Sequence, residues 1–254
     1  VLMGPQNWIF LRGLVRDSRH WGAFVAEFEQ TIPEARVVML DVPGNGVLNA
    51  LTSPTTVRGM VENCRAQLQA RGVAGPYRIL AVSMGAMLAA EWSHAYPDDV
   101  QAQVLINTSM RPFSAFYQRL RPANYGTLFR LLWGRTSAHD WERAILRMTT
   151  NQPHEHILPA WQHFREQHPV TTANALRQLL AAARYQASSA TPKAPTLVLA
   201  SEKDQLVSVS CSRALAACWG VPLAVHPTAG HDLTLDDGHW VAQQVSDWSL
   251  SGFR

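Results

Sequence analysis

Short apolar segments recur along the chain, and each is bounded by turn residues. Nearly continuous apolar runs of this length are typical of strands that are covered on both faces of a parallel sheet. The predicted strands are Trp8–Leu11, Val37–Leu40, Tyr77–Val82, Val104–Ile106, Thr196–Ala200 and Leu223–Val225. Helical patterns separate them, at Trp21–Gln30, Thr56–Arg71, Met84–Ala95, Ser210–Trp219 and Asp237–Ser249. This alternation predicts an α/β fold with a doubly wound, mostly parallel sheet.

Residues 111–190 depart from this alternation, because they contain no convincing strand. Their pattern instead predicts helices at Phe113–Leu120, Gly126–Leu132, His139–Thr150, His156–Gln167 and Thr172–Ala187. We expect this helical block to be a cap inserted into a core made of residues 1–110 and 191–254. The alternative is a set of ordinary surface helices.

Aromatic residues in this block would give a cap an apolar lining for a substrate. The candidates for that lining are Phe113, Phe116, Tyr117, Trp133 and Trp161. The alternative is that each of them packs the block onto the core. Three arginines near the start of the block could bind an acidic substrate or carrier; the alternative is that they form a solvated face. They are Arg111, Arg119 and Arg121.

The composition narrows the class of protein. Of the 254 residues, 47% are hydrophobic and 16% are charged, which favours a sizeable buried core over disorder. The net charge is +3, but no run of Lys or Arg is present, so nucleic-acid binding is not expected. The chain has no apolar run long enough for a transmembrane helix and no signal-peptide pattern at its beginning. We therefore expect a cytoplasmic protein without a membrane span, and the oligomeric state stays open.

The most informative segment is Ile79–Met87, which reads as an apolar strand, a serine between small residues and a helix. A serine on a tight turn from strand to helix has a strained backbone, and bulky side chains two positions away would collide. The pattern around Ser83 is A-x-S-x-G, with Ala81 in place of the usual first glycine. The N–H of Met84, at the start of the helix, would point toward a developing negative charge. An ordinary serine at the N-terminus of a helix is the alternative.

With this segment, the chain resembles the α/β-hydrolase family of enzymes. Residues Ile9–Leu14 match the strand and "HG" loop of that family, with Arg12 in place of the usual histidine. In the family, the residue after the glycine donates a second N–H to the oxyanion, which here is Leu14. Residues Leu40–Gly46 match the D-x-P-G-x-G turn of the family. The resemblance covers residues 1–110 and 191–254 and implies the α/β-hydrolase fold with a helical cap.

The resemblance also implies a catalytic acid and a histidine. The run Pro195–Asp204 looks like the late strand of the family with Asp204 as its acid, and Ala229–Asp232 looks like the loop that carries His231. The order serine, acid, histidine is that of the family. Glu202 is the nearest competitor for the acid. Rivals for the base are His226 and His239, and the His154–His156 pair lacks a third ligand for a metal.

A serine hydrolase is the function that these residues predict. Histidine would take the Ser83 proton as the hydroxyl attacks an acyl carbonyl, and the N–H groups of Leu14 and Met84 would hold the oxyanion. The expected substrate is a small or medium carboxylic ester or thioester, free or carrier-bound, and no cofactor or metal is required. Similar proteins include small bacterial carboxylesterases such as the pimeloyl-carrier methyl esterase group. A C–C bond hydrolase, a lyase, an acyltransferase and a non-catalytic receptor of the same fold are the alternatives.

Overall fold

The computed structural model describes residues 6–253 and contains a six-stranded sheet in the order β2-β1-β3-β4-β5-β6. All five strand pairs are parallel. The strands are β1 (Gln6–Leu11), β2 (Ala35–Leu40), β3 (Tyr77–Val82), β4 (Val100–Ile106), β5 (Thr196–Ser201) and β6 (Leu223–His226). The predicted α/β-hydrolase sheet is therefore confirmed, with each strand at its expected place in the chain.

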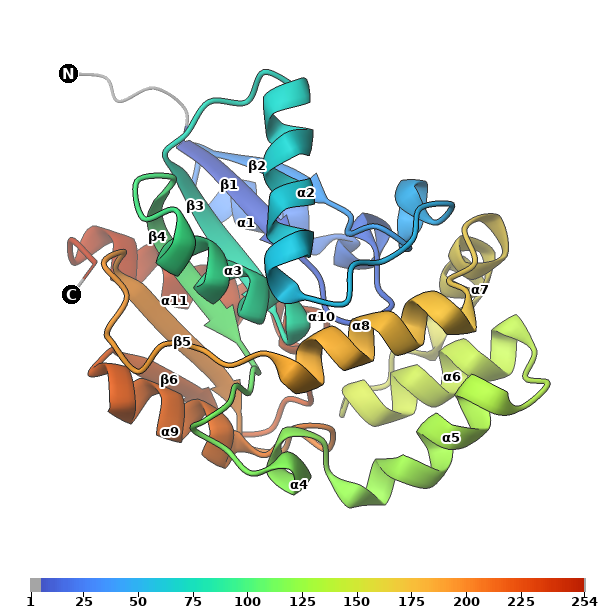
Figure 1. The fold of residues 1–254 in the computed structure, drawn as a ribbon. Coiled ribbons are helices and arrows are strands. Elements are labelled where there is room, and N and C mark those ends of the chain that lie inside the picture. Colours follow the sequence, from blue (N-terminus) through green and yellow to red (C-terminus); the bar gives the residue numbers. More distant parts are fainter. Residues whose placement is uncertain (1–5, 254) are drawn as a thin grey trace.

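Helices cover both faces of the sheet and extend beyond one of its ends (Figure 1). They are α1 (Phe24–Thr31), α2 (Val57–Ala70), α3 (Met84–Ala95), α4 (Phe116–Arg119), α5 (Tyr125–Trp133), α6 (Ala138–Thr149), α7 (Leu158–Gln167), α8 (Thr172–Arg184), α9 (Val209–Trp219), α10 (Leu233–Asp236) and α11 (Gly238–Leu250). Short 3-10 turns occur at Ser18–Trp21, Gly46–Leu48, Pro122–Asn124 and Glu155–Ile157. No helix in the described range is both long and apolar enough to span a bilayer.

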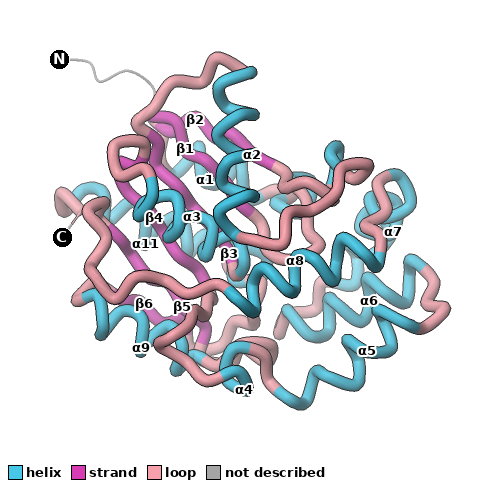
Figure 2. Tube along the Cα trace, in the orientation of Figure 1, coloured by secondary structure: helices cyan, strands magenta, loops and turns pink. Residues whose placement is uncertain are grey.

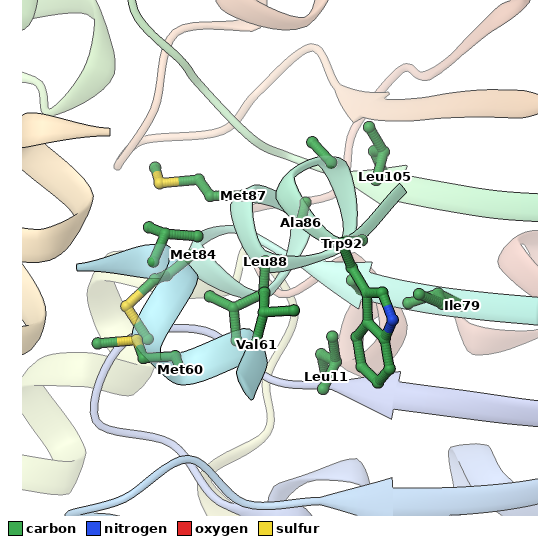
Figure 3. Packing of buried hydrophobic residues seen from close by; sticks show 14 of the residues in the cluster. Leu11, Met60, Val61, Ile79, Met84, Ala86, Met87, Leu88, Trp92 and Leu105 are labelled. Atoms are coloured by element: carbon green, nitrogen blue, oxygen red, sulfur yellow. The ribbon is translucent and has the colours of Figure 1, made fainter. Parts of the chain in front are cut away.

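Alternate residues of the strands face two separate hydrophobic clusters, as the period of two in a strand requires. Ile79 and Ala81 of β3 belong to the cluster that packs against α2, α3 and α9. Figure 3 shows part of this cluster, with side chains of α2 and α3 meeting those of β1, β3 and β4. Leu80 and Val82 point to the other face, where α1 and α11 complete the second cluster. Burial on both faces explains why the strands are nearly continuous apolar runs.

β4 is longer than the predicted Val104–Ile106, because it begins at Val100. Two glutamines interrupt the apolar pattern there and conceal the strand in the sequence. Gln103 is fully buried, and its amide donates to the Thr196 hydroxyl of β5 at 2.9 Å. A hydrogen bond between neighbouring strands thus allows a buried glutamine inside β4, although the apolar pattern does not predict a strand at that position.

The chain between β4 and β5 is helical in the structure, and it leaves and rejoins the sheet at one place. Arg111 and Gln186 form an isolated parallel bridge, and the Ala187 N–H donates to the Arg111 carbonyl at 2.8 Å. We call residues 111–190 the helical insertion. Figure 1 shows its helices α5 to α8 beyond the arrowheads of the strands, and Figure 2 shows the same helices in cyan to one side of the magenta strands. The carboxyl ends of parallel strands are where α/β proteins place their ligands.

The first helix of the insertion is shorter than the predicted Phe113–Leu120. α4 comprises only Phe116–Arg119, and Leu120 is already extended, with φ −144° and ψ 111°. Arg121 is extended as well, because the residue before a proline is disfavoured in the helical region and Pro122 follows. The longer helices α5 to α8 fall within about two to three residues of their predicted positions, the usual uncertainty of helix ends.

Candidate active site

Ser83 lies on a sharp turn directly between β3 and α3. Its backbone has φ 56° and ψ −116°, a region that non-glycine residues rarely adopt. The Ser83 N–H donates to the Ile106 carbonyl at 2.9 Å, and the Ser83 carbonyl accepts from the Thr108 hydroxyl at 2.9 Å. These bonds to the end of β4 hold the strained turn in place.

Two glycines allow the loop after β1 to lie directly against this turn. A Cβ atom at Gly13 would be 3.2 Å from Ser83 Cβ and 3.7 Å from Ser83 Oγ. A Cβ atom at Gly85 would be 2.7 Å from the Arg12 carbonyl oxygen, which is closer than real Cβ atoms approach. The small residue two positions after the serine is therefore required by close packing of α3 on the loop, as the A-x-S-x-G pattern indicates.

The two backbone N–H groups predicted to hold an oxyanion have no hydrogen-bond acceptor among the described residues. Among residues 6–253, neither the Leu14 N–H nor the Met84 N–H donates to an acceptor within the protein. Met84 is the first residue of α3, where helical N–H groups have no partner in the helix. The next residue of the loop, Val15, has φ 53°, and its N–H donates to Gln178 Oε1 of α8 at 3.0 Å. The helical insertion thus contacts the loop that carries Leu14.

His231 and Asp204 are joined by a buried hydrogen bond of 2.7 Å between Nδ1 and Oδ2. Both side chains are almost fully buried. The other carboxylate oxygen, Oδ1, accepts the N–H groups of Leu206 at 2.7 Å and Val207 at 2.9 Å. These bonds fix the carboxylate, and the carboxylate in turn fixes the imidazole so that Nε2 remains available to a hydroxyl.

Asn107, which sequence reasoning passed over, connects the histidine loop with the end of β4. Its Nδ2 donates to the His231 carbonyl at 2.8 Å and to the Ser201 hydroxyl at 3.0 Å, while its Oδ1 accepts the Ser201 N–H at 2.8 Å. The next residue, Thr108, bonds to the Ser83 carbonyl. Asn107 and Thr108 therefore tie the serine turn and the histidine loop to one strand end. The only signal in the sequence is their position directly after an apolar strand.

Arg12, which stands where the α/β-hydrolase pattern has histidine, forms a buried ion pair with Asp232. The guanidinium contacts the two carboxylate oxygens at 2.5 and 3.2 Å and lies 4.8 Å from the centre of the Trp21 ring. Burial acts to raise the pKa of the Asp232 carboxyl, but the charge and hydrogen bonds of Arg12 outweigh it and hold that pKa below the ordinary value. Since Asp232 follows His231, this pair links the loop of Leu14 to the histidine loop.

The rivals named from the sequence have other partners. Glu202 is partly exposed and pairs with Arg213 at 2.6 Å. His226 lies 3.1 Å from Asp237 and accepts the Ala229 N–H at 2.9 Å. His239 is exposed on α11, and His154 pairs with Asp236 at 3.1 Å. None of these side chains contacts the His231–Asp204 pair through a hydrogen bond within the described range.

The helical insertion is held against the histidine loop by backbone contacts and by Asp236. The Asp232 N–H donates to the Thr149 carbonyl, at the end of α6, at 2.7 Å. The Asp236 carboxylate is fully buried and accepts the N–H groups of Gly230 at 2.7 Å and Asn151 at 2.9 Å. One carboxylate therefore connects the insertion with the residue before His231.

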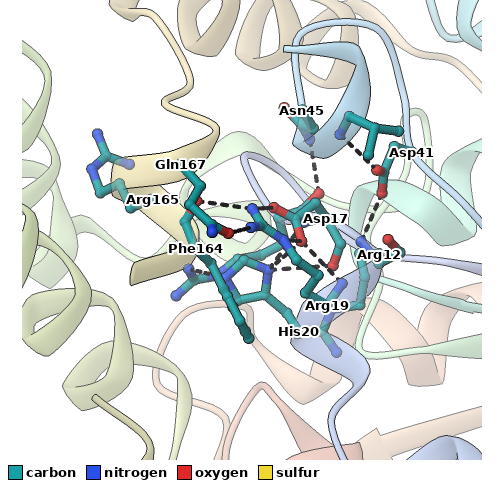
Figure 4. Close-up of polar contacts among 12 residues, drawn as sticks. Arg12, Asp17, Arg19, His20, Asp41, Asn45, Phe164, Arg165 and Gln167 are labelled. Atoms are coloured by element: carbon teal, nitrogen blue, oxygen red, sulfur yellow. Dashed lines mark hydrogen bonds and ion pairs between the residues drawn. The ribbon is translucent and has the colours of Figure 1, made fainter. Parts of the chain in front are cut away.

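A second contact of the insertion is a buried charged cluster beside the loop of Leu14. Arg16 donates to Glu142 of α6 at 2.5 Å, and Arg165 of α7 lies 3.9 Å from the same carboxylate. Burial and the neighbouring Arg16 lower the pKa of His20, so the imidazole is neutral near pH 7. Figure 4 shows the outer part of this cluster, where Arg19 joins Asp17 to α7 through the Phe164 carbonyl and the Gln167 side chain.

The five aromatic residues predicted to line a substrate site are not brought together. Phe113 packs edge-on against Trp219 at 6.0 Å, and Trp161 packs against His20 at 5.3 Å. Phe116, Tyr117 and Trp133 are exposed, with relative accessibilities of 74%, 53% and 59%. A substrate lining made by these residues therefore has no support in their positions.

A cavity of about 600 Å³ lies next to the candidate acid, but it does not reach the serine. It is lined by Arg121, Asn151, Glu202, Lys203, Asp204, Gln205 and Thr228. Neither Ser83 nor His231 belongs to this lining, and each lining residue has a polar or charged side chain. The cavity is therefore a poor candidate for an apolar acyl group.

Comparison with known proteins identifies the family and the fold of the chain. The model of the family described as "Serine aminopeptidase, S33" matches residues 9–238. No curated protein matches the chain. The match to the family model covers every residue of the candidate site described above.

Solved structures with different activities share the fold. An enol-lactonase from Burkholderia xenovorans LB400 superposes with a TM-score of 0.78 at 18% identity, over 98% of this chain and 92% of that one. A thermophilic esterase from Thermogutta terrifontis gives 0.75 at 19% identity, over 99% and 92%. A hydrolase from Pseudomonas aeruginosa PA01 gives 0.76 at 18% identity, over 97% and 90%. At these sequence identities the similarity shows that the fold is shared, but it does not identify the substrate of this chain.

Proposed function

Because the chain belongs to the serine aminopeptidase S33 family and is an α/β-hydrolase, we propose that it cleaves carboxylic esters with a Ser83–His231–Asp204 triad. The observation that carries this proposal is the position of Ser83: a strained turn, faced by Gly13 and tied through Thr108 and Asn107 to the His231 loop. In a triad of this kind a histidine held by a carboxylate activates the serine hydroxyl, and the strained turn from strand to helix exposes that hydroxyl.

The reaction begins with removal of the Ser83 proton. With Nδ1 of His231 donating to Asp204, Nε2 accepts the proton as Oγ attacks the acyl carbonyl. The negative charge that develops on the carbonyl oxygen is held by the N–H groups of Leu14 and Met84. Removing one such donor typically lowers the rate by about 10²–10³.

The acyl-enzyme is then hydrolysed by the same groups. His231 first gives its proton to the leaving alcohol. It then takes a proton from a water molecule, which attacks the acyl carbon, and passes that proton to Ser83 Oγ as the bond to the acyl group breaks and the acid leaves. Asp204 stays ionised and stabilises the imidazolium in both steps. All proton transfers in this scheme are made by groups of the chain itself.

The helical insertion is proposed to act as a cap that positions the two loops of the site. It reaches the loop of Leu14 through Gln178 and the histidine loop through Thr149 and Asp236. Substrate selection by a cap would then depend on these inward contacts rather than on the exposed aromatic residues.

Hydrolysis of p-nitrophenyl butyrate by purified protein tests the proposal. Ser83→Ala should lower kcat by about 10⁴-fold or more, because nucleophile and general base act as a unit. A fluorophosphonate probe should label the wild type and leave Ser83→Ala unlabelled. A matched control is Ser93→Ala in α3, which removes a buried hydroxyl outside the site and should leave turnover intact.

Other outcomes would redirect or end the proposal. Turnover of aminoacyl p-nitroanilides without ester hydrolysis would assign an aminopeptidase, and transfer of the acyl group to an added alcohol would assign an acyltransferase. If folded protein shows neither turnover nor fluorophosphonate labelling, the hypothesis that it is an enzyme is contradicted and a ligand-binding receptor is favoured.

A further inference from the structure

Exposed aromatic side chains are confined to one stretch of the chain. Among the described residues, every exposed Phe, Tyr or Trp lies between residues 116 and 133. They are Phe116, Tyr117, Tyr125, Phe129 and Trp133, with relative accessibilities of 74%, 53%, 39%, 64% and 59%. We call them the outer aromatic surface. An apolar surface of this kind on a folded protein marks a site of interaction.

α5 is apolar on two sides, although only one side packs against the protein. Leu131 is buried against α6, and Leu128 and Leu132 pack around it. Tyr125, Phe129 and Trp133 are spaced four residues apart, so they form one stripe on a different face of the helix. The Phe129 and Trp133 rings stack at 4.9 Å. In Figure 1, α5 lies at the outer edge of the helical insertion.

The same part of the chain is strongly basic. From Val100 to His139 the sequence has five arginines and neither aspartate nor glutamate; they are Arg111, Arg119, Arg121, Arg130 and Arg135. None of them forms an ion pair within residues 6–253. Arg119 donates to the Ala182 and Ala183 carbonyls at the end of α8, whereas Arg130 and Arg135 are exposed. The nearest acidic residue in the sequence is Asp140, which bonds to Ser137.

We propose that the outer aromatic surface docks on an anionic lipid bilayer. Aromatic side chains are the residues that favour the interface between headgroups and acyl chains, and arginines among them bind anionic headgroups. A second copy of the chain fits less well, because the same basic surface would face itself and like charges would repel. Docking places the helical insertion, which contacts the histidine loop through Thr149, next to the membrane.

Binding to lipid vesicles tests this directly and does not depend on catalysis. Ether-linked phosphatidylcholine vesicles, with and without a quarter of ether-linked phosphatidylglycerol, lack ester bonds, so hydrolysis cannot alter them. The wild type should cosediment with the anionic vesicles and much less with the neutral ones. Raising the salt from 50 mM to 500 mM should weaken binding, since ions screen charges at a surface.

Matched variants separate the aromatic from the basic contribution. Arg130→Gln with Arg135→Gln should weaken partitioning by about 30-fold, about fivefold for each arginine near an anionic surface. Phe129→Ser with Trp133→Ser should weaken it by about tenfold or more. The controls are Leu250→Ser and Arg36→Gln, which change an exposed apolar and an exposed basic residue elsewhere and should bind as the wild type does.

Three results would overturn the proposal. The first is no binding of the wild type, or equal binding to neutral and anionic vesicles. The second is unchanged binding by both double variants with intact circular dichroism and melting temperature. The third is concentration-dependent dimerisation in analytical ultracentrifugation that Phe129→Ser with Trp133→Ser abolishes, which would assign the surface to a second copy. Ester hydrolysis by the same samples reports separately on the proposed triad.

Discussion

On the inner side of the helical insertion, arginines and aromatic rings are buried together. Arg16 lies 4.3 Å from the centre of the Trp161 ring, Arg165 lies 3.8 Å from that of Trp141, and Glu142 contacts both guanidinium groups. On the outer side, the insertion exposes Phe129 and Trp133 among arginines that have no carboxylate partner in the described range. Both sides thus use the same residue types in opposite environments.

The carboxylate of Glu142 makes the difference between these two sides. A guanidinium group taken out of water needs a countercharge and hydrogen bonds, or the loss of hydration outweighs what packing contributes. Burial lowers the pKa of Arg165 to about 10, which reflects this penalty. Within residues 6–253, no carboxylate lies within reach of the arginines on the outer side, so their guanidinium groups stay hydrated at the surface. They are therefore available to bind an anionic partner. Arginine and aromatic content alone therefore does not distinguish a core from a docking surface.

The largest expected effect comes from removing the inner countercharge. Glu142→Leu leaves the buried Arg16 and the partly buried Arg165 without a carboxylate and should lower the free energy of unfolding by about 3–5 kcal/mol. Urea denaturation followed by circular dichroism measures this change.

The control for this variant is Glu166→Leu, which changes an exposed glutamate on α7 and should alter the free energy of unfolding by less than about 0.5 kcal/mol. Adding Arg16→Met to Glu142→Leu should restore part of the stability, since one unpaired charge is removed. Equal losses for Glu142→Leu and Glu166→Leu would show that the inner cluster is not a stabilising contact.

A smaller effect on stability, with a larger one on catalysis, is expected at Gln178. Gln178→Met removes the acceptor of the Val15 N–H and should lower the free energy of unfolding by about 1–3 kcal/mol. Because the loop of Leu14 loses its support, kcat for p-nitrophenyl butyrate should fall about 10- to 100-fold. KM should change little, since the role proposed for this loop is to hold the oxyanion, which forms only as the reaction proceeds.

Leu180→Gln, a half-exposed position on the same helix, should change neither kcat nor stability appreciably. Measuring fluorophosphonate labelling rates in parallel separates a displaced oxyanion loop from a general loss of folding. A fall in kcat that merely follows the fraction of unfolded protein would remove the positioning role assigned to Gln178.

The smallest effect is expected on the outer side. Phe129→Ser with Trp133→Ser should change the free energy of unfolding by less than about 1 kcal/mol, because exposed side chains contribute little to the folded state. Ester hydrolysis in solution should be unchanged. If the free energy of unfolding measured in urea fell by about 2 kcal/mol or more, these rings would be covered in solution. The claim that the outer side exposes its aromatic residues would then be wrong.

Much of the fold could be predicted from the chain, because periodicity is a local property. Burial on both faces leaves a visible apolar run, and the strands were placed within a few residues except where Gln101 and Gln103 lengthen β4. The candidate site was predicted because Gly13, Gly85 and the serine turn are required by close packing, which leaves few residue types. Asn107 was missed, since a buried asparagine that bridges two loops has no signature of its own.

By itself, the sequence pattern predicted the α/β sheet, the helical segment within it and the serine turn at Ser83, because each depends on local periodicity or spacing. The resemblance to the α/β-hydrolase family added Asp204 and His231 as candidate residues. Only the tertiary structure decided which arginines are paired and which aromatic residues are buried. Those outcomes depend on contacts between distant residues, such as Arg12 with Asp232 and Arg16 with Glu142. A local pattern cannot reveal whether a carboxylate from elsewhere in the chain lies within reach of a guanidinium group.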